Sequence, residues 1–107
     1  MTTTDDSAAP GASFAVEPGD GEVVVSAIGE VDLDTVREFQ AAVDSALEGA
    51  PARLIFELSQ TSFMDSSGLA VLVMASNRAK VSIRNPSTMV RRVVEISGLA
   101  ETLGLPE

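Results

Sequence analysis

The sequence contains neither cysteine nor histidine. Disulfide bonds, thiolate nucleophiles and zinc sites built from these two residue types are therefore excluded, and so is acid–base catalysis by imidazole. Most familiar hydrolase mechanisms depend on at least one of these groups. We therefore expect a protein that is not an enzyme and that binds no metal ion and no cofactor.

Long apolar segments are also lacking. The longest unbroken apolar run, from Leu69 to Ala75, has seven residues, whereas a helix needs about 20 to cross a bilayer. The first residues, Met1 to Asp6, have no basic flank and no apolar stretch behind them, unlike a secretory signal. The sequence accordingly predicts a cytoplasmic protein without direct membrane insertion.

Positive charge is scarce in the first half of the chain. The sequence has 7 Lys and Arg against 16 Asp and Glu, a formal net charge of −9, and residues 1–52 contain a single base, Arg37. Because this charge repels phosphate backbones, we expect no nucleic-acid partner. Five bases between Arg78 and Arg92 could attract a phosphate or an acidic partner, but we interpret most of them as solvated helix positions.

A chain of 107 residues accommodates one domain. Residues 1–13 are small or polar, with Met1 as the only large apolar side chain, which is too little to offset the entropy of ordering the backbone. We therefore predict a disordered leader at 1–13 and a single domain at 14–107.

The order of the predicted elements is typical of a small α/β domain. Turn residues, a capping box from Thr35 to Glu38 and a C-terminal Gly98 mark element ends. The pattern predicts strands at 14–17, 22–28, 54–58 and 81–84, and helices at 35–48, 66–77 and 87–97. The strand at 54–58 is so apolar that we expect it in the centre of the sheet with both faces covered. The predicted fold is a small mixed sheet of four to five strands packed against three to four helices.

The most informative segment, residues 62–69, lies between a buried strand and a helix, where open α/β sheets bind ligands. If Asp65 or Ser66 is the N-cap, the hydroxyls of Ser66 and Ser67 lie at the positive end of the helix, which favours a phosphate. Gly68 lacks a Cβ and would allow close approach to the backbone. The alternative interpretation, a helix cap and nothing more, is equally compatible with these residue types.

The helix after this segment has apolar residues on two faces. One stripe can face the sheet and is made of Leu69, Leu72, Val73 and Ser76. A second stripe is too apolar for a solvated surface and is made of Ser67, Val71, Met74 and Arg78. We interpret the second stripe as a surface for a protein partner, with Met74 as an adaptable contact. Alternatively, its two apolar members pack beneath a loop.

Ser66 does not have the surroundings of a catalytic nucleophile. Met64 stands where a nucleophile elbow needs glycine, and the chain has no histidine and no Ser-x-x-Lys at this point. Ser66 as the substrate of a kinase needs only access. Asp32, Asp34 and Asp65 could gather a divalent cation, but we favour helix capping for at least one of the first two.

Four runs of the sequence resemble one known family when they are taken in order: Gly29 to Thr35, Leu54 to Ser59, Phe63 to Leu69, and Val90 to Arg92 with Ile96 to Leu99. They are similar to the STAS domain of bacterial anti-sigma factor antagonists, over about residues 14–105. In that family the serine directly after the aspartate of Asp-Ser-Ser-Gly-Leu is phosphorylated. The resemblance therefore implies phosphorylation of Ser66, with Ser67 as the fallback.

The resemblance further implies partner switching. The unmodified protein binds an anti-sigma factor that is also a serine kinase, which frees a sigma factor for transcription. Phosphorylation ends this binding, and a serine phosphatase of the metal-dependent type restores it. A phosphate adds about −1.5 to −2 charges to an interface that must close tightly. The expected partner-binding residues are Asp32, Asp65, Ser67, Gly68, Val71 and Met74.

Two other functions stay open at this point. A STAS domain can act as the regulatory subunit of a lipid or anion transporter through protein contact alone, and the intact serine after Asp65 favours the first function over this one. A small metal-dependent or nucleotide-binding enzyme is disfavoured, because the chain lacks histidine, cysteine and a glycine-rich phosphate loop.

Overall fold

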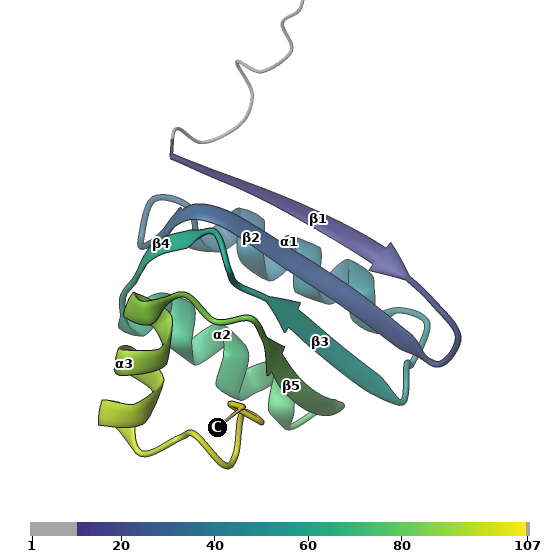
Figure 1. Ribbon diagram of the computed structural model, residues 1–107. Coiled ribbons are helices and arrows are strands. Elements are labelled where there is room, and N and C mark those ends of the chain that lie inside the picture. Colours follow the sequence, from purple (N-terminus) through teal and green to yellow (C-terminus); the bar gives the residue numbers. More distant parts are fainter. Residues whose placement is uncertain (1–10, 107) are drawn as a thin grey trace, which may run out of the picture.

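The computed structural model describes residues 11–106 (Figure 1). Most of the predicted leader thus lies outside the described residues, but its end at residue 13 is wrong. Ala12 and Ser13 already belong to the first strand, where they pair with Gly29 and Ile28. The second strand is longer than predicted and offers backbone partners to these residues, whatever their side chains.

The described residues form five strands and three helices, which confirms the predicted α/β class. In chain order they are β1 (Ala12–Pro18), β2 (Glu22–Val31), α1 (Val36–Leu47), β3 (Arg53–Glu57), β4 (Thr61–Met64), α2 (Ser66–Ser76), β5 (Lys80–Arg84) and α3 (Thr88–Ser97). Every predicted strand and helix is present within a few residues. The short strand β4 was not predicted, because its residues alternate neither in polarity nor in burial.

The sheet has the order β1-β2-β3-β5, and β4 pairs with the far end of β2. β1 is antiparallel to β2, whereas β3, β4 and β5 run parallel to their neighbours. β3 pairs with β2 from Glu22 to Ser26, and β4 then takes over from Gly29 to Val31. β2 and β4 therefore end together, with Val31 opposite Met64.

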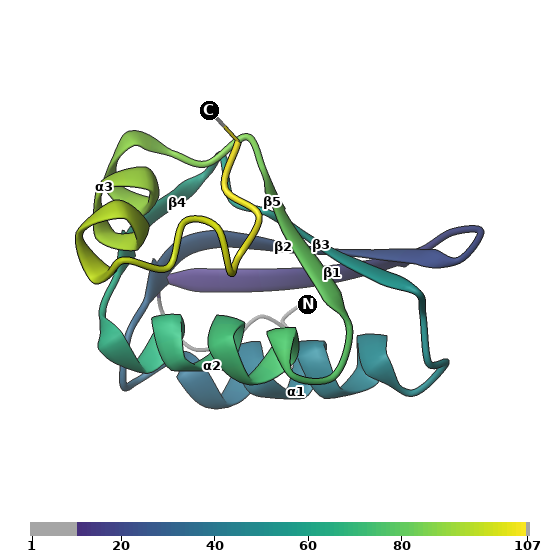
Figure 2. The ribbon, with the colours of Figure 1, turned by 90° about the horizontal axis from the view of Figure 1, so that it is seen from below.

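The core lies between the sheet and the two helices α1 and α2, which run side by side along one face (Figure 2). Phe39 of α1 is fully buried there and contacts Phe14 and Phe56, with ring centroids 5.4 and 5.8 Å away. α3 packs beside β4, and the hydroxyl of its N-cap Ser87 donates to the carbonyl of Thr61 at 2.7 Å. The helices α1 and α2 on one face of the sheet, together with α3 beside β4, therefore hold the ends of β2 and β4 in fixed positions.

β3 lies between β2 and β5, as predicted, but only one of its faces is fully covered. Leu54 and Phe56 are buried under the helices, whereas Ile55 and Glu57 on the opposite face are half-buried. The prediction of a strand covered on both faces is therefore wrong, because α1 and α2 share one face. No helix within residues 11–106 is long and apolar enough to span a membrane.

Candidate functional site

The candidate site lies where β2 and β4 end and the chain enters α1 and α2 (Figure 1). Val31 and Met64 are paired across the two parallel strands, and the backbone N–H of Asp65 donates to the carbonyl of Val31 at 3.1 Å. Asp32 and Asp65 follow directly on these paired residues. The sheet therefore brings together two acidic turns that are 33 residues apart in the sequence.

Asp65 is the N-cap of α2. One of its carboxylate oxygens accepts hydrogen bonds from the backbone N–H groups of Ser67 and Gly68, at 2.9 and 3.4 Å. The same oxygen accepts a bond from the Ser67 hydroxyl at 2.5 Å. The negative charge thus satisfies N–H groups at the positive end of the helix, which is the most favourable place for a carboxylate on a helix.

The two adjacent serines have different surroundings. Ser66 is the first residue of α2 and is exposed, and its hydroxyl forms no hydrogen bond with any residue that the structure describes. Ser67 is half-buried, and its hydroxyl proton is engaged by Asp65. Of the two hydroxyls, only that of Ser66 is both accessible and free to be positioned by another protein.

Gly68 has a structural role that differs from the predicted one. It is buried, and a Cβ at this position would lie 2.7 Å from Cγ1 of Val31 and 2.9 Å from Cγ of Met64. The expectation that a partner approaches its backbone is wrong, because the chain's own core fills the space beside it. Gly68 instead lets the first turn of α2 pack closely on β2 and β4.

The predicted faces of α2 are correct only in part: Leu72 is buried and Leu69 packs against the core, as expected, but Val71 of the second stripe is buried as well. The buried residues of this helix are Gly68, Val71, Leu72 and Ala75. Val71 is only 4% exposed and belongs to the core, so it offers no surface to a partner. The helix is apolar on nearly every side, and hydrophobic spacing therefore cannot identify its inner face. Close packing at Gly68 decides which face turns inward.

The surface of α2 that faces solvent carries Ser66, Ala70 and Met74, one turn apart. Met74 is 53% exposed, as expected for a partner contact. Met74 of the predicted second stripe is therefore on the surface. Its exposed neighbours on the helix, however, are Ala70 and Ser66, and not Val71 and Ser67 as predicted. We call Ser66, Ala70 and Met74 the exposed stripe of α2.

The turn between β2 and α1 is held by its own polar groups. A carboxylate oxygen of Asp32 accepts the backbone N–H of Asp34 at 3.0 Å, and the buried Thr35 hydroxyl donates to the carbonyl of Glu30 at 2.8 Å. Thr35 is the N-cap of α1 but makes no side-chain cap bond, so the predicted capping box is wrong. Its hydroxyl is used instead to close the turn.

Within residues 11–106, no group of three or more acidic side chains is arranged to hold a metal ion. The five bases between Arg78 and Arg92 also have ordinary roles. Three of them form ion pairs with nearby acids, at N–O distances of 3.5 to 3.9 Å: Arg78 with Asp44, Arg84 with Glu57 and Arg91 with Glu95. All three pairs are open to solvent on at least one side, which agrees with a solvated surface.

Sequence reasoning assigned no role to Glu57. Its carboxylate accepts the backbone N–H of Ser59 at 3.1 Å and the side-chain amide of Asn85 at 2.9 Å. Burial raises the pKa of Glu57, but these hydrogen bonds and the charge of Arg84 outweigh it and lower the pKa below its usual 4.5. Glu57 thus joins the ends of β3 and β5.

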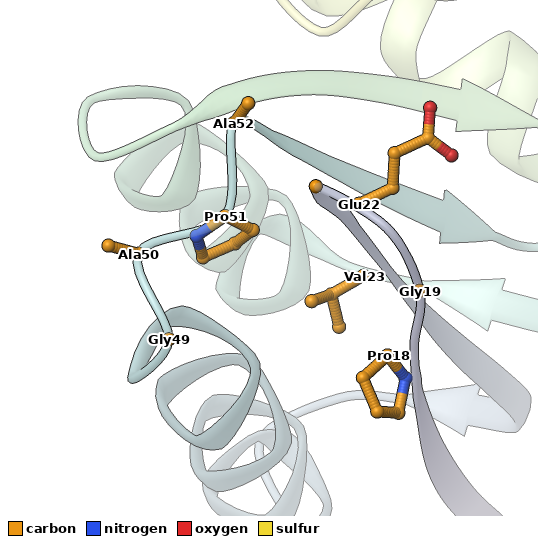
Figure 3. A pocket seen from close by; sticks show the side chains of 9 residues that line it. Pro18, Gly19, Glu22, Val23, Gly49, Ala50, Pro51 and Ala52 are labelled. Carbon is orange, nitrogen blue, oxygen red and sulfur yellow. The ribbon is translucent and has the colours of Figure 1, made fainter.

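A cavity of about 420 Å³ lies at the opposite end of the sheet, between the β1–β2 turn and the α1–β3 loop (Figure 3). Pro18, Val23 and Pro51 form much of its wall, and among the described residues Glu22 is the only charged one that lines it. It contains none of the predicted site residues. Specific small-molecule sites bring several polar groups together, and this cavity does not.

Comparison with known proteins identifies the family to which the chain belongs. Residues 14–106 match a family model described as "Mlab, STAS domain". An anti-sigma F factor antagonist of Lysinibacillus sphaericus is 31% identical over 83 residues, which are 72% of this chain and 71% of that protein. The chain belongs to the STAS domain family of anti-sigma factor antagonists.

Solved structures of this family share the fold. An anti-sigma factor antagonist from Mycobacterium paratuberculosis superposes with a TM-score of 0.75 at 31% identity, covering 90% of this chain and 86% of that one. SpoIIAA in its unphosphorylated form gives a TM-score of 0.72 at 29% identity, covering 83% and 84% of the two chains. The Bacillus protein SpoIIAA in its phosphorylated form gives 0.67, also at 29% identity, covering 83% of this chain and 86% of that one.

Proposed function

We propose that this STAS domain is an anti-sigma factor antagonist whose binding is switched by phosphorylation of Ser66. In the unphosphorylated state it binds an anti-sigma factor that is also a serine kinase, and so releases a sigma factor for transcription. Phosphorylation by that kinase ends the binding, and a metal-dependent serine phosphatase reverses it. The protein then acts in the cytoplasm as a binding regulator and catalyses no reaction itself.

The observation that carries this proposal is the difference between the two serine hydroxyls. Ser66 is exposed and unbonded at the first position of α2, whereas the hydroxyl of Ser67 is held by Asp65 at 2.5 Å. A kinase must bring the hydroxyl oxygen into line with the γ-phosphate of ATP. It can do so at Ser66 without breaking a hydrogen bond, whereas at Ser67 it must first break the bond from the hydroxyl to Asp65.

The N-cap also explains why a phosphate at Ser66 would be repelled. The carboxylate of Asp65 already takes the N–H groups of Ser67 and Gly68, so a phosphate cannot use them without displacing it. The new charge of about −1.5 to −2 then lies beside Asp65, and the Asp32 turn leaves the sheet at the same edge. Two unit charges 4 Å apart repel by about 1 kcal/mol in water and about 4 kcal/mol near a protein surface.

The exposed stripe supplies the contact that this charge would disrupt. Ser66 occupies one end of the stripe, and Met74 lies two turns away on the same face of α2. A partner that covers the apolar atoms of Ala70 and Met74 must also exclude water from the Ser66 hydroxyl. An unmodified hydroxyl tolerates this loss of water far better than a phosphate does, since burying an unpaired charge is costly.

Phosphorylation of purified variants tests the proposal. The protein is incubated with the anti-sigma factors of the organism that encodes it, with magnesium and ATP, and the phosphate is located by mass spectrometry. We expect modification of the wild type and of Ser67→Ala, and none of Ser66→Ala. Modification confined to Ser67 would contradict the assignment of the acceptor.

Binding measurements on the same variants test the switch. Isothermal titration calorimetry should show that Ser66→Ala binds the anti-sigma factor about as tightly as the wild type, whereas Ser66→Glu binds at least tenfold more weakly. Ser67→Glu would disturb the N-cap of α2, so Glu17→Gln on β1 serves as the surface control. Equal affinity of all Ser66 variants for the anti-sigma factor would refute the switch.

A further inference from the structure

The two edges of the sheet, β1 and β5, differ in how the chain covers them. The C-terminal segment lies along β5. The backbone N–H of Ile83 donates to the carbonyl of Gly104 at 3.1 Å, and a Cβ on Gly104 would lie 2.8 Å from Cα of Ser82. No described residue pairs with the outer side of β1 (Figure 1). Within the described part of the chain, β1 is therefore the open edge of the sheet.

The register of β1 with β2 shows which backbone groups face this open edge. The backbone N–H of Glu30 donates to the carbonyl of Gly11 at 2.7 Å, so these two residues form a hydrogen-bonded pair. In an antiparallel ladder, hydrogen-bonded and non-hydrogen-bonded pairs alternate. The N–H and C=O groups of Ala12, Phe14 and Val16 therefore point away from β2 and toward the open edge.

The sequence of this edge does not protect it from a further strand. Exposed edges are usually blunted by a lysine, a proline, a bulge or an inward-pointing charge. Residues 12–16 contain no charge and no proline, and their pairing with β2 has no bulge. Pro18 is the next residue on the outward-facing positions, and its ring takes the place of an N–H donor. The segment open to pairing is therefore 12–16.

A second copy of this chain can satisfy every outward group of the segment. The donors and acceptors are arranged symmetrically about Phe14, so two β1 strands can pair antiparallel with Phe14 opposite the partner's Phe14. Ala12 then lies opposite the partner's Val16, and each outward N–H of both copies has a carbonyl acceptor. A register shifted by two residues toward Pro18 would instead place the Pro18 ring against the partner's Ala12.

The side chains are compatible with this register. Phe14 and Val16 lie on the face that α1 covers but are only half-buried, and the Phe14 ring stacks on Phe39 at 5.4 Å. Pairing would place the two Phe14 rings side by side and cover the parts that a single copy leaves exposed. On the other face, Ser13 lies opposite the partner's Ala15, so small side chains meet there.

The helix layer also fits a second copy. Since α1 packs on both β1 and β2, it lies over the space between them. Strands are about 4.8 Å apart, so the two α1 helices of a pair would be two strand spacings, or about 10 Å, apart, the upper end of the distance between packed helices. Ser45, which shares a hollow with Val16, marks the side of α1 that faces the partner, and Ala42 lies one turn earlier on that side. Both side chains are small, so the helices can approach.

We propose that this protein forms a symmetric dimer through the open edges of two β1 strands, which joins two five-stranded sheets into one. The inference does not depend on the proposed function. β1 pairs with one side of β2 and β4 with the other, so Ser66 stays accessible in both subunits. Pairing along 12–16 with one helix contact is smaller than a standard interface, and the dimer is therefore weak and depends on protein concentration.

Sedimentation equilibrium of the wild-type protein, over about 1–500 μM, tests the dimer. Refractive index is the detection method, because the chain has neither tryptophan nor tyrosine. We expect the average mass to rise from one chain to two. Salt should strengthen association, since it screens the repulsion between copies that each carry a net charge of −9. A single-chain mass at all concentrations, or a dimer weakened by salt, would overturn the proposal.

Disulfide trapping tests the register, and the absence of native cysteine makes each introduced thiol unique. Ser13 and the partner's Ala15 form a non-hydrogen-bonded pair with Cα atoms about 4.5 Å apart, within the range of a disulfide. Ser13 and the partner's Ser13 are diagonal neighbours about 7–8 Å apart, which is too far. A mixture of Ser13→Cys and Ala15→Cys should therefore form covalent dimers under mild oxidation, and neither variant should do so alone.

Ser26→Cys is the matched control for trapping. Ser26 pairs with Ala15 of its own chain, so it lies on the same face one strand further from the edge. Mixed with Ser13→Cys, it should give no covalent dimer. Trapping with Ser26→Cys, or equal trapping of the single variants and the mixture, would refute the register.

Ala12→Pro tests the backbone bonds of the dimer. It removes an N–H that β2 does not use, so circular dichroism of the dilute protein should show an unchanged thermal midpoint, whereas sedimentation should show loss of the dimer. Ser66→Glu is the control and should dimerise like the wild type. Undiminished dimerisation of Ala12→Pro contradicts the proposal, and if its midpoint falls, the cysteine variants decide. Loss of the dimer would leave the proposed function standing, and a failure of Ser66 phosphorylation would leave the dimer standing.

Discussion

Replacement of Gly68 by alanine tests the packing that positions Ser66. The new Cβ would lie 2.7 Å from Cγ1 of Val31 and 2.9 Å from Cγ of Met64, closer than carbon atoms approach in proteins. Both neighbours are almost fully buried, at 0% and 1% exposed, and the branched Val31 has little freedom to turn away. Overpacking of this kind costs about 1–3 kcal/mol.

Two opposing effects decide whether Gly68→Ala raises or lowers the free energy of unfolding. Alanine in place of glycine inside a helix stabilises by up to about 1 kcal/mol, so we expect Gly68→Ala to lower the free energy of unfolding by about 1 kcal/mol net. Gly49→Ala is the control, because a Cβ at Gly49 meets nothing within 4 Å and its φ is not positive. That variant should be neutral or slightly more stable than the wild type.

Urea denaturation of the two variants provides the measurement. A double variant sharpens the test. In a Val31→Ala background the Cγ1 atom of Val31 is gone and only Cγ of Met64, at 2.9 Å, still lies too close, so Gly68→Ala should lower the stability less there than in the wild type. Such coupling between neighbours is what a double-mutant cycle detects. The argument fails if Gly68→Ala is as stable as the wild type, or if its cost is unchanged in the Val31→Ala background.

Two further predictions concern the exposed stripe and the junction of β3 with β5. Met74→Asp should weaken binding to the anti-sigma factor with little change in thermal midpoint, because Met74 is 53% exposed. Val71→Asp should unfold the domain, because Val71 is only 4% exposed. If both variants unfold, Met74 belongs to the core and the prediction is wrong. The pKa of Glu57 is lowered in the folded state, so its contribution to stability is present above pH 4.5 and is lost as the pH falls through the lowered pKa. Urea titrations should therefore show Glu57→Gln to be less stable than the wild type at pH 7 and equal to it in strong acid, and a gap that persists at low pH would contradict this.

Local patterns were sufficient to predict most elements and to single out the segment that carries the candidate site. In α1, the spacing of Phe39, Val43 and Leu47 matches the face that the structure buries. Gly98 ends α3 with a positive φ of 79°, as its position after the last periodic residue predicts. The segment at 62–69 was singled out because it lies between a buried strand and a helix, where open α/β sheets bind ligands.

Properties that depend on residues far apart in the sequence could not be obtained in this way. β4 is a strand because the end of β2 extends beyond β3 and offers it backbone partners, a fact about pairing and not about its own residues. The hydroxyl of Thr35 does not cap α1. It donates instead to the carbonyl of Glu30 and so closes the β2–α1 turn, where the chain leaves a buried strand.

α2 shows most clearly what depends on tertiary structure. Its residues are apolar on nearly every side, so their order specifies a helix but not which face turns inward. Val31 and Met64 settle that question, because only the glycine at position 68 allows the helix to approach them closely. Once Gly68 is packed there, helical geometry turns Ser66 and Met74 outward and Val71 inward, and the surface available to a partner follows from that contact.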